Sequence, residues 1–167
     1  VYGCVTPVDD KGANIARIAP MVAGWGDGVP GVQLNRMCGS GQEAVNIAGA
    51  KVAAGHHDAL IAGGVEHMTR VPMYSDAGEL SDTYYEEFPE YIKQGESAER
   101  IAEKWDFSRE ELDEIAAESQ QRYGEAVESG RYDAEIAPVR TELEGEQIVV
   151  EEDGHPRPDT DVETLRD

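Results

Sequence analysis

The first part of the chain alternates short apolar segments with glycine-rich breaks. Apolar residues at helical spacing predict a helix over residues 13–23. Residues 32–34 alternate like a short strand, residues 43–54 have the composition of an alanine-rich helix, and the continuous apolar run at 59–65 predicts a strand covered on both faces. Strand, helix and strand in this order predict a right-handed parallel unit over 32–65, which is a piece of an α/β fold.

The second part of the chain has a different pattern. Residues 70–95 carry prolines, tyrosines and scattered acids without a sustained period, which indicates an irregular excursion over the surface. A short helix is expected over residues 97–105. Ser108 followed by Glu111 is a capping-box pattern, so a second helix should begin there, and Gly130 should end it.

The second of these helices carries an apolar stripe, which predicts that one face is buried and the rest is solvated. The stripe consists of Leu112, Ile115, Ala116, Tyr123, Ala126 and Val127. Farther along the chain, residues 137–142 and 147–151 flank a turn around Glu144-Gly145-Glu146. Two short segments on either side of such a turn predict a β-hairpin.

Length and composition narrow the class of protein. The chain has 167 residues, 40% of them hydrophobic, which is one domain's worth of chain with enough apolar material for a core. The apolar runs are shorter than the roughly 18 residues of a membrane span, and we expect neither a span nor a secretory leader. The two cysteines, Cys4 and Cys38, fit neither a disulfide framework nor a zinc site, which favours a reducing, cytoplasmic setting.

The chain is strongly acidic, with a formal net charge of −21. Residues 1–75 carry 6 acidic and 5 basic residues, whereas residues 76–167 carry 29 acidic and 9 basic residues. Nucleic acid is a poor partner for such a chain, because phosphate binding needs a basic stripe. Excess acid with few lysines is typical of salt-adapted proteins, and an ordinary acidic surface is the alternative interpretation.

Cys38 is the strongest candidate for chemistry. It follows a short predicted strand and precedes a predicted helix, so its sulfur should lie near the N-terminus of that helix. Unpaired N–H groups and the positive end of the helix dipole favour a nucleophilic thiolate there, and the same N–H groups can hold an oxyanion. By position alone, plain packing remains the alternative, because free cysteines are often buried.

The segment around Cys38 resembles the nucleophile signature of the thiolase family. Asn35-Arg-Met-Cys-Gly-Ser-Gly41 is similar to Asn-Arg-x-Cys-x-Ser-Gly, and Ala62-Gly-Gly-Val-Glu-His-Met-Thr69 resembles the family block Ala-Gly-Gly-x-Glu-x-Met-Ser. Other stretches resemble the family in order and spacing: 12–17 upstream, and 95–99, 108–113, 130–133, 135–139 and 157–160 downstream. The resemblance covers nearly the whole chain, which makes it far more specific than one short motif.

The resemblance implies part of a thiolase-like layered α/β/α fold. Residues 1–69 would form the N-terminal α/β core, incomplete at its start, and residues 70–167 an irregular, helix-containing loop domain. The implied activity is acyl transfer: Cys38 attacks the 3-keto carbon of a 3-ketoacyl-CoA, acetyl-CoA leaves, and the acyl group passes from the cysteine to coenzyme A. The reverse condensation of two acetyl-CoA molecules is equally implied. Coenzyme A thioesters are thus the expected substrates, with no bound cofactor.

The resemblance also implies residues beyond this chain. Thiolases use a histidine that activates the cysteine and a second cysteine that moves a proton, both in C-terminal motifs that this sequence lacks. We therefore expect a fragment of a homo-oligomeric enzyme that is inactive alone. The alternative, from another functional class, is a non-catalytic acyl-CoA-binding or assembly subunit that keeps the thiolase half-fold.

The remaining polar residues are weaker candidates for chemistry. Glu66 and Met68 are expected to shape the fold around the site, and Cys4, in a strand-like apolar run, is expected in the core. The histidines lack the spacing of metal ligands, and none can be assigned the base role. They are His56, His57, His67 and His155.

Overall fold

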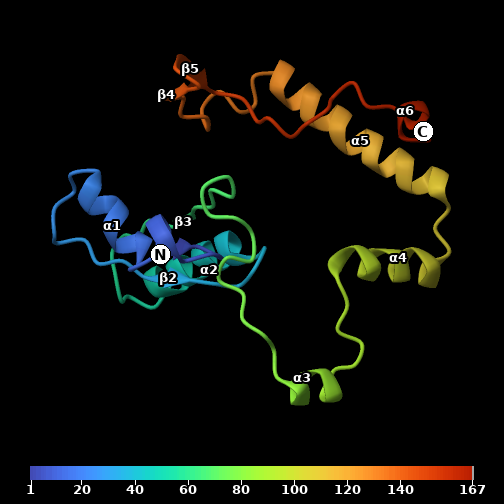
Figure 1. Ribbon diagram of the computed structural model, residues 1–167. Helices are drawn as coiled ribbons and strands as arrows, with labels where there is room; N and C mark the ends of the chain where they lie inside the picture. The colour runs from blue at the N-terminus through green and yellow to red at the C-terminus, as the bar shows by residue number, and fades with distance from the viewer. Residues whose placement is uncertain (167) are drawn as a thin grey trace. The chain divides into compact units, whose positions relative to one another are not determined.

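Three short parallel strands organise the first part of the chain in the computed structural model, which describes residues 1–166 (Figure 1). β1 (Tyr2–Gly3) lies between β2 (Gln33–Leu34) and β3 (Gly63–Gly64). Tyr2 is opposite Gln33 on one side and Gly63 on the other, and both pairings are parallel. The predicted parallel α/β arrangement is confirmed, with the difference that β1 separates the two predicted strands.

Helix α2 (Ser40–Ala53) packs on β1 and β3. Its buried residues, Ser40, Ala44 and Ala48, are spaced four apart, so they form one face of the helix. A Cβ atom on Gly3 would lie 2.7 Å from the carbonyl carbon of Ser40, so glycine is needed for this close approach. The helix begins at Ser40 rather than at residue 43. Ser40 and Gly41, residue types that are common at breaks between elements, lie in its first turn.

Two further helical segments connect β1 to β2. The 3₁₀-helix η1 (Asp9–Lys11) is followed by α1 (Ile15–Val22), which contacts β2. The backbone N–H of Ile15 donates to Gln33 Oε1 at 2.9 Å, and this bond joins the start of α1 to β2. The helix predicted over residues 13–23 is therefore confirmed.

The apolar run at 59–65 is not a buried strand. Only Gly63 and Gly64 pair with β1, and Ile61 is 62% exposed. The prediction of a strand covered on both faces is therefore wrong for the structure described here. An apolar run shows that a segment can be covered, but the covering layer must come from other residues, and β3 is an edge strand with a neighbour on one side only.

The chain folds into two compact units, Val1–Glu87 and Phe88–Asp167. The sequence-based boundary between residues 69 and 70 stays a prediction. α3 (Asp82–Glu87) is a short helix inside the stretch predicted to be irregular. α4 (Gln94–Trp105) begins three residues before the helix predicted over 97–105.

Helix α5 (Arg109–Glu128) has the predicted capping box. The backbone N–H of Glu111 donates to Ser108 Oγ at 3.2 Å, and the backbone N–H of Ser108 donates to the Glu111 carboxylate at 2.8 Å. Gly130 follows the helix with φ +71°, so the predicted end is also confirmed. The sequence thus defines both ends of α5 correctly.

The predicted buried stripe of α5 is wrong. Ile115 is 58% exposed, and Leu112 and Val127 are exposed too, whereas Asp113 and Ala117 are buried. The face that is covered lies beside the stripe, because the segment that ends in α6 (Val162–Arg166) runs along it. Its bonds to α5 include one from the backbone N–H of Arg157 to Gln120 Oε1 at 2.6 Å and one from the Arg109 guanidinium to the Leu165 carbonyl.

The predicted hairpin is confirmed. β4 (Val139–Leu143) pairs with β5 (Glu146–Val150) in antiparallel register, with Val139 opposite Val150. The two-residue turn consists of Glu144 at φ +52° and Gly145 at φ +88°. Positive φ at both positions is typical of the hairpin turn that matches the twist of the strands.

No helix among residues 1–166 is long and apolar enough to cross a membrane.

Candidate active site

Cys38 lies in the turn that leads from β2 into α2. Its side chain is exposed, and Gly39 is the residue that caps the start of the helix. Met37, immediately before it, has φ +49°, a left-handed backbone conformation that is uncommon for a side chain of this size. The predicted position of Cys38 beside a helix N-terminus is therefore observed.

Hydrogen bonds within the turn fix its shape. Ser40 Oγ accepts the backbone N–H of Arg36 at 2.9 Å and donates to the Met37 carbonyl at 2.6 Å. Asn35 Oδ1 accepts the backbone N–H of Met37 at 2.9 Å. Buried Ser40 thus holds the turn from inside, and Asn35 holds it from the end of β2.

Several donors at the start of α2 are unused. Among residues 1–166, the backbone N–H groups of Cys38, Gly41 and Gln42 have no hydrogen-bond acceptor. These groups lie at the positive end of a helix of 14 residues, next to the exposed thiol. Such a set of donors can accept an anion or a developing oxyanion.

Cys4 is buried, whereas Cys38 is exposed. Cys4 is 1% exposed, as predicted for a core residue. Burial raises the pKa of the Cys4 thiol, and the negative charge of Glu66 raises it further. Cys4 therefore stays protonated and shielded, whereas Cys38 is open to reagents.

Glu66 is the centre of a polar cluster beside β1. Its carboxylate accepts the backbone N–H of Val5 at 2.5 Å and the Thr6 hydroxyl at 2.6 Å, and it forms an ion pair with Lys11, whose side chain is almost fully buried. Burial alone would raise the pKa of Glu66, but the hydrogen bonds from Lys11, Thr6 and Val5 outweigh burial and lower it to about 2. The expectation that Glu66 shapes the fold agrees with these contacts.

Lys11 and Thr6 are members of this cluster that the sequence did not indicate. Both are buried, and the Lys11 ammonium also donates to the Thr6 hydroxyl. A lysine in a polar stretch gives no sign of burial, and only the parallel pairing of β1 with β3 brings residue 66 to it.

The histidines do not join this site. His67 Nδ1 accepts the backbone N–H of Arg70 at 3.3 Å, and within residues 1–166 no histidine is hydrogen-bonded to Cys38. In the same described part of the chain, no group of three or more His, Cys, Asp or Glu side chains could hold a metal ion. The turn before α2 combines an exposed thiol with unused backbone N–H donors.

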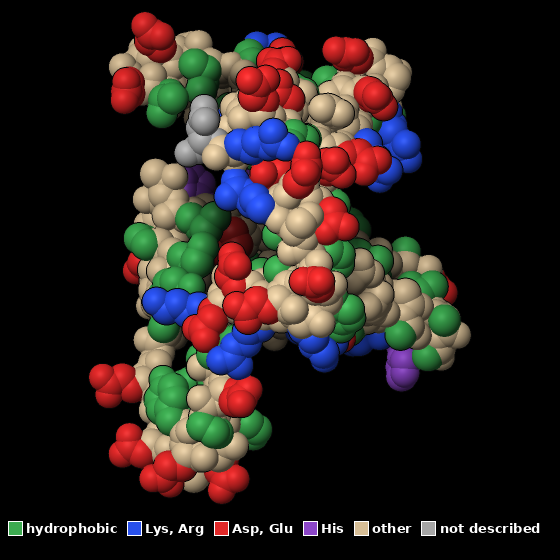
Figure 2. All heavy atoms as spheres, turned by 90° about the vertical axis from the view of Figure 1, so that its right-hand side faces the viewer, with side chains coloured by type: hydrophobic (Ala, Val, Ile, Leu, Met, Phe, Trp, Pro, Cys, Tyr) green, Lys and Arg blue, Asp and Glu red, His purple; other side chains and the backbone are tan. Residues whose placement is uncertain are grey.

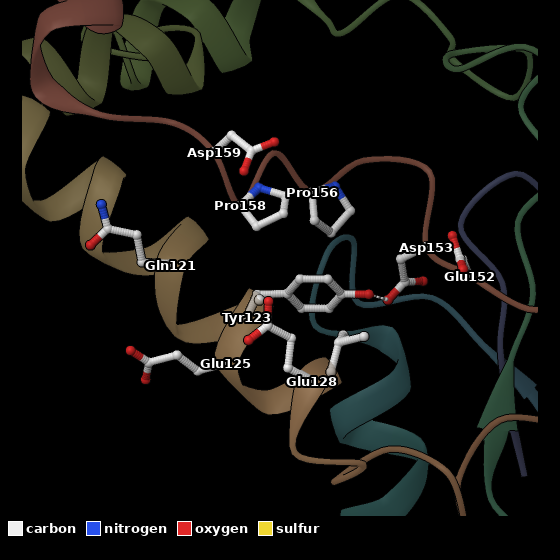
Figure 3. Close-up of a pocket in the computed structure, with 11 residues that line it drawn as sticks. Gln121, Tyr123, Glu125, Glu128, Glu152, Asp153, Pro156, Pro158 and Asp159 are labelled. Carbon is white, nitrogen blue, oxygen red and sulfur yellow. Dashed lines mark hydrogen bonds between the residues drawn. The ribbon is translucent and has the colours of Figure 1, made fainter.

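A separate pocket of about 620 Å³ lies within residues 121–159 (Figure 3). The Tyr123 ring lies near Pro156 and Pro158, and its hydroxyl donates to Asp153 at 3.3 Å. Desolvation raises the pKa of Tyr123, and the negative charge of Asp153 raises it further. The pocket walls carry several carboxylates and include neither cysteine, so this pocket is separate from the Cys38 turn.

The sequence matches a known family model. Residues 1–167 match the thiolase N-terminal domain. The chain belongs to the thiolase family. Thiolases are acyl-CoA C-acyltransferases, so the family to which the chain belongs is a family of enzymes.

Individual thiolases are similar over nearly all of this chain. The beta-ketoadipyl-CoA thiolase of Pseudomonas aeruginosa is 35% identical over 180 residues, which cover 98% of this chain and 45% of that protein. The 3-ketoacyl-CoA thiolase of Bacillus subtilis is 36% identical over 176 residues, which cover 99% of this chain and 45% of that protein. The chain thus spans less than half the length of these thiolases.

Solved thiolase structures share the fold. The dimeric peroxisomal thiolase of Saccharomyces cerevisiae superposes with a TM-score of 0.83 at 30% identity, covering 99% of this chain and 43% of that one. The acetyl-CoA acetyltransferase of Bacillus anthracis gives a TM-score of 0.78 at 32% identity, covering 99% of this chain and 45% of that one. The thiolase-like α/β fold expected from the sequence motifs is confirmed.

Proposed function

We propose that Cys38 is the nucleophile of a thiolase and carries the acyl group as a thioester. The observation that supports this role is the exposed Cys38 thiol beside the unused N–H groups at the start of α2. The same segment carries the residues that resemble the thiolase nucleophile signature. A nucleophile in acyl transfer needs access to the substrate and donors for the developing oxyanion, and this turn has an exposed thiol beside such donors.

The proposed reaction has two steps. The Cys38 thiolate attacks the 3-keto carbon of a 3-ketoacyl-CoA, and the tetrahedral oxyanion collapses with cleavage of the C2–C3 bond. The electron pair of that bond goes to C2 of acetyl-CoA, which takes up a proton. In the second step a CoA thiol loses its proton and attacks the acyl carbon, which releases acyl-CoA and returns the Cys38 thiolate. The Cys38 N–H stabilises the oxyanion in both steps.

The proposal also includes the substrates, the oligomeric state and the cellular location of the protein. Coenzyme A thioesters of 3-keto acids are proposed as substrates because curated relatives are named for such compounds. A homo-oligomer is proposed because a structural relative is described as dimeric. Two free cysteines support a cytoplasmic location, and the acidic excess supports adaptation to high salt. Proton transfer would use residues outside this turn.

Alkylation kinetics test the role of Cys38. Iodoacetamide labelling at neutral pH, followed by peptide mass mapping, should modify Cys38 several-fold faster than the cysteine of a free peptide with the sequence of residues 35–41. Acetyl-CoA should slow the reaction at Cys38. Cys4 should remain unlabelled in the folded chain because it is buried.

The free peptide is the matched control, since it has the same neighbours but no helix. A Cys38 rate equal to that of the peptide, unaffected by acetyl-CoA, would contradict the nucleophile role. That result would favour the non-catalytic subunit that keeps the thiolase half-fold.

A further inference from the structure

We propose that Asn35 is a positioning residue, which holds the Met37–Cys38 turn so that the Cys38 N–H stays directed at the acyl oxygen. This inference rests on the proposed function of Cys38. It assigns to one side chain the task of keeping an oxyanion donor in place.

Asn35 forms a bridge between two segments of the chain. Its Nδ2 donates to the Val5 carbonyl at 3.1 Å, and its Oδ1 accepts the Met37 N–H at 2.9 Å. Both ends of the amide are therefore used. One end is fixed to the segment that follows β1, and the other end to the turn that carries Cys38.

The segment at the far end of this bridge is itself anchored. The backbone N–H of Val5, on the residue whose carbonyl Asn35 binds, donates to Glu66 Oε1 at 2.5 Å. Glu66 is in turn paired with buried Lys11. Because β1, β2 and β3 are parallel, Val5, Asn35 and Glu66 follow three strand ends at the same edge of the sheet.

The turn needs such a hold because its backbone is strained. A left-handed conformation at a non-glycine residue is unfavourable because the Cβ atom comes too close to the following carbonyl oxygen, and Met37 adopts one at φ +49°. The bond from the Met37 N–H to Asn35 Oδ1 stabilises that conformation directly. Ser40 Oγ holds the Met37 carbonyl, which belongs to the same peptide group as the Cys38 N–H, so the turn has two holds. Loss of the Asn35 bond removes one of them, and we expect the Cys38 N–H to shift away from its direction.

Two reagents separate donor geometry from thiol reactivity. With 4-nitrophenyl acetate, the Cys38 thiolate attacks the ester carbonyl, a tetrahedral oxyanion forms, and 4-nitrophenolate leaves as the carbon–oxygen bond breaks. With iodoacetamide, sulfur displaces iodide and no oxyanion forms. The ratio of the acylation rate to the alkylation rate cancels thiolate fraction and exposure. It therefore reports on the oxyanion donor.

The experiment measures this ratio at Cys38 in the full chain, by peptide mass mapping. In Asn35→Ala the ratio should fall about tenfold, which equals about 1.4 kcal/mol. Asn35→Asp should lower it as well, because the second carboxylate oxygen cannot donate to the Val5 carbonyl. Asn46→Ala, an exposed change of the same type farther along α2, is the matched control and should leave the ratio unchanged.

A ratio in Asn35→Ala within twofold of the wild type would overturn the inference, and so would an equal fall in Asn46→Ala. Far-ultraviolet circular dichroism and thermal unfolding check that all three variants fold. Failure of the proposed function would give a different result, because wild-type Cys38 would then be alkylated no faster than the cysteine of the free peptide. A normal wild-type alkylation rate with unchanged ratios in both Asn35 variants rejects the positioning role alone.

Discussion

At the scale of single residues, Glu66 has the largest shift in pKa in the described structure. The pKa of its carboxyl group is about 2, against an ordinary value of 4.5, because Lys11, Thr6 and Val5 donate hydrogen bonds to the carboxylate. A carboxylate whose pKa is lower in the folded chain than in the unfolded chain stabilises the fold above the unfolded pKa. This stabilisation is lost as the pH falls through the folded value.

The corresponding prediction compares the wild type with Glu66→Gln. The free-energy difference of unfolding between them should shrink by about 1–2 kcal/mol as the pH falls from about 5 to about 2, allowing for partial exposure of the carboxylate. Urea titrations at several pH values measure it. Glu103→Gln, a change in an exposed side chain of α4, shows the effect of removing one surface charge. A difference that stays constant with pH would mean that Glu66 contributes no linked protonation.

The position of Cys38 beside a helix N-terminus was predictable from the sequence, but most of the contacts that support the turn were not. The place of this cysteine before a small-residue helix indicates a thiol near N–H donors, which the structure has, whereas the exposure of the thiol is known only from the structure. The cluster of Thr6, Lys11 and Glu66 joins residues far apart in the sequence, so only strand pairing reveals it. Local patterns report local geometry, whereas long-range polar contacts depend on topology.

At the scale of elements, capping signals were more reliable than burial patterns. Ser108 and Glu111 defined the start of α5 because the hydrogen bonds that begin a helix are local. The apolar stripe of α5 and the apolar run at 59–65 both predict burial, yet Ile115 and Ile61 are exposed. Periodicity identifies an apolar face but does not supply the layer that covers it.

The capping box leads to a prediction for α5. Ser108→Ala should lower the free energy of unfolding by about 1 kcal/mol, because the N–H of Glu111 loses its acceptor. Urea unfolding measures the total effect, and amide exchange in the first turn of α5 locates it. Ser119→Ala, exposed within the same helix, should be neutral or slightly stabilising. Equal losses in the two variants would show that the cap contributes nothing specific.

At the scale of the whole molecule, charge is the dominant feature. The formal net charge is −21, and acidic side chains stand out over the face drawn in Figure 2. Most ion pairs are on the surface, such as Arg100 with Glu96 and Arg122 with Glu118, and pairs of this kind contribute little. The carboxylates that have no basic partner should therefore repel one another at low ionic strength and destabilise the folded chain.

The prediction is a gain of stability with salt. Raising NaCl from about 0.1 M to about 1 M at neutral pH shortens the Debye length from about 10 Å to about 3 Å, so repulsion weakens and the melting temperature should rise. Near pH 4, where carboxylates begin to take up protons, the gain should be smaller. Thermal unfolding across salt and pH measures both. A melting temperature that is flat in salt would contradict self-repulsion, and a gain of equal size at both pH values would indicate a general salt effect.

The middle position of β1 also sets an order for the assembly of the sheet. Tyr2 finds one partner roughly 30 positions later and the other roughly 60 positions later, and closing the longer loop costs about 0.6 kcal/mol more for each doubling of length. We therefore expect β1 to meet β2 before it meets β3. The turn with the thiol would then take shape while Glu66 is still unattached, and the arrival of β3 would lock it in the last stage of folding.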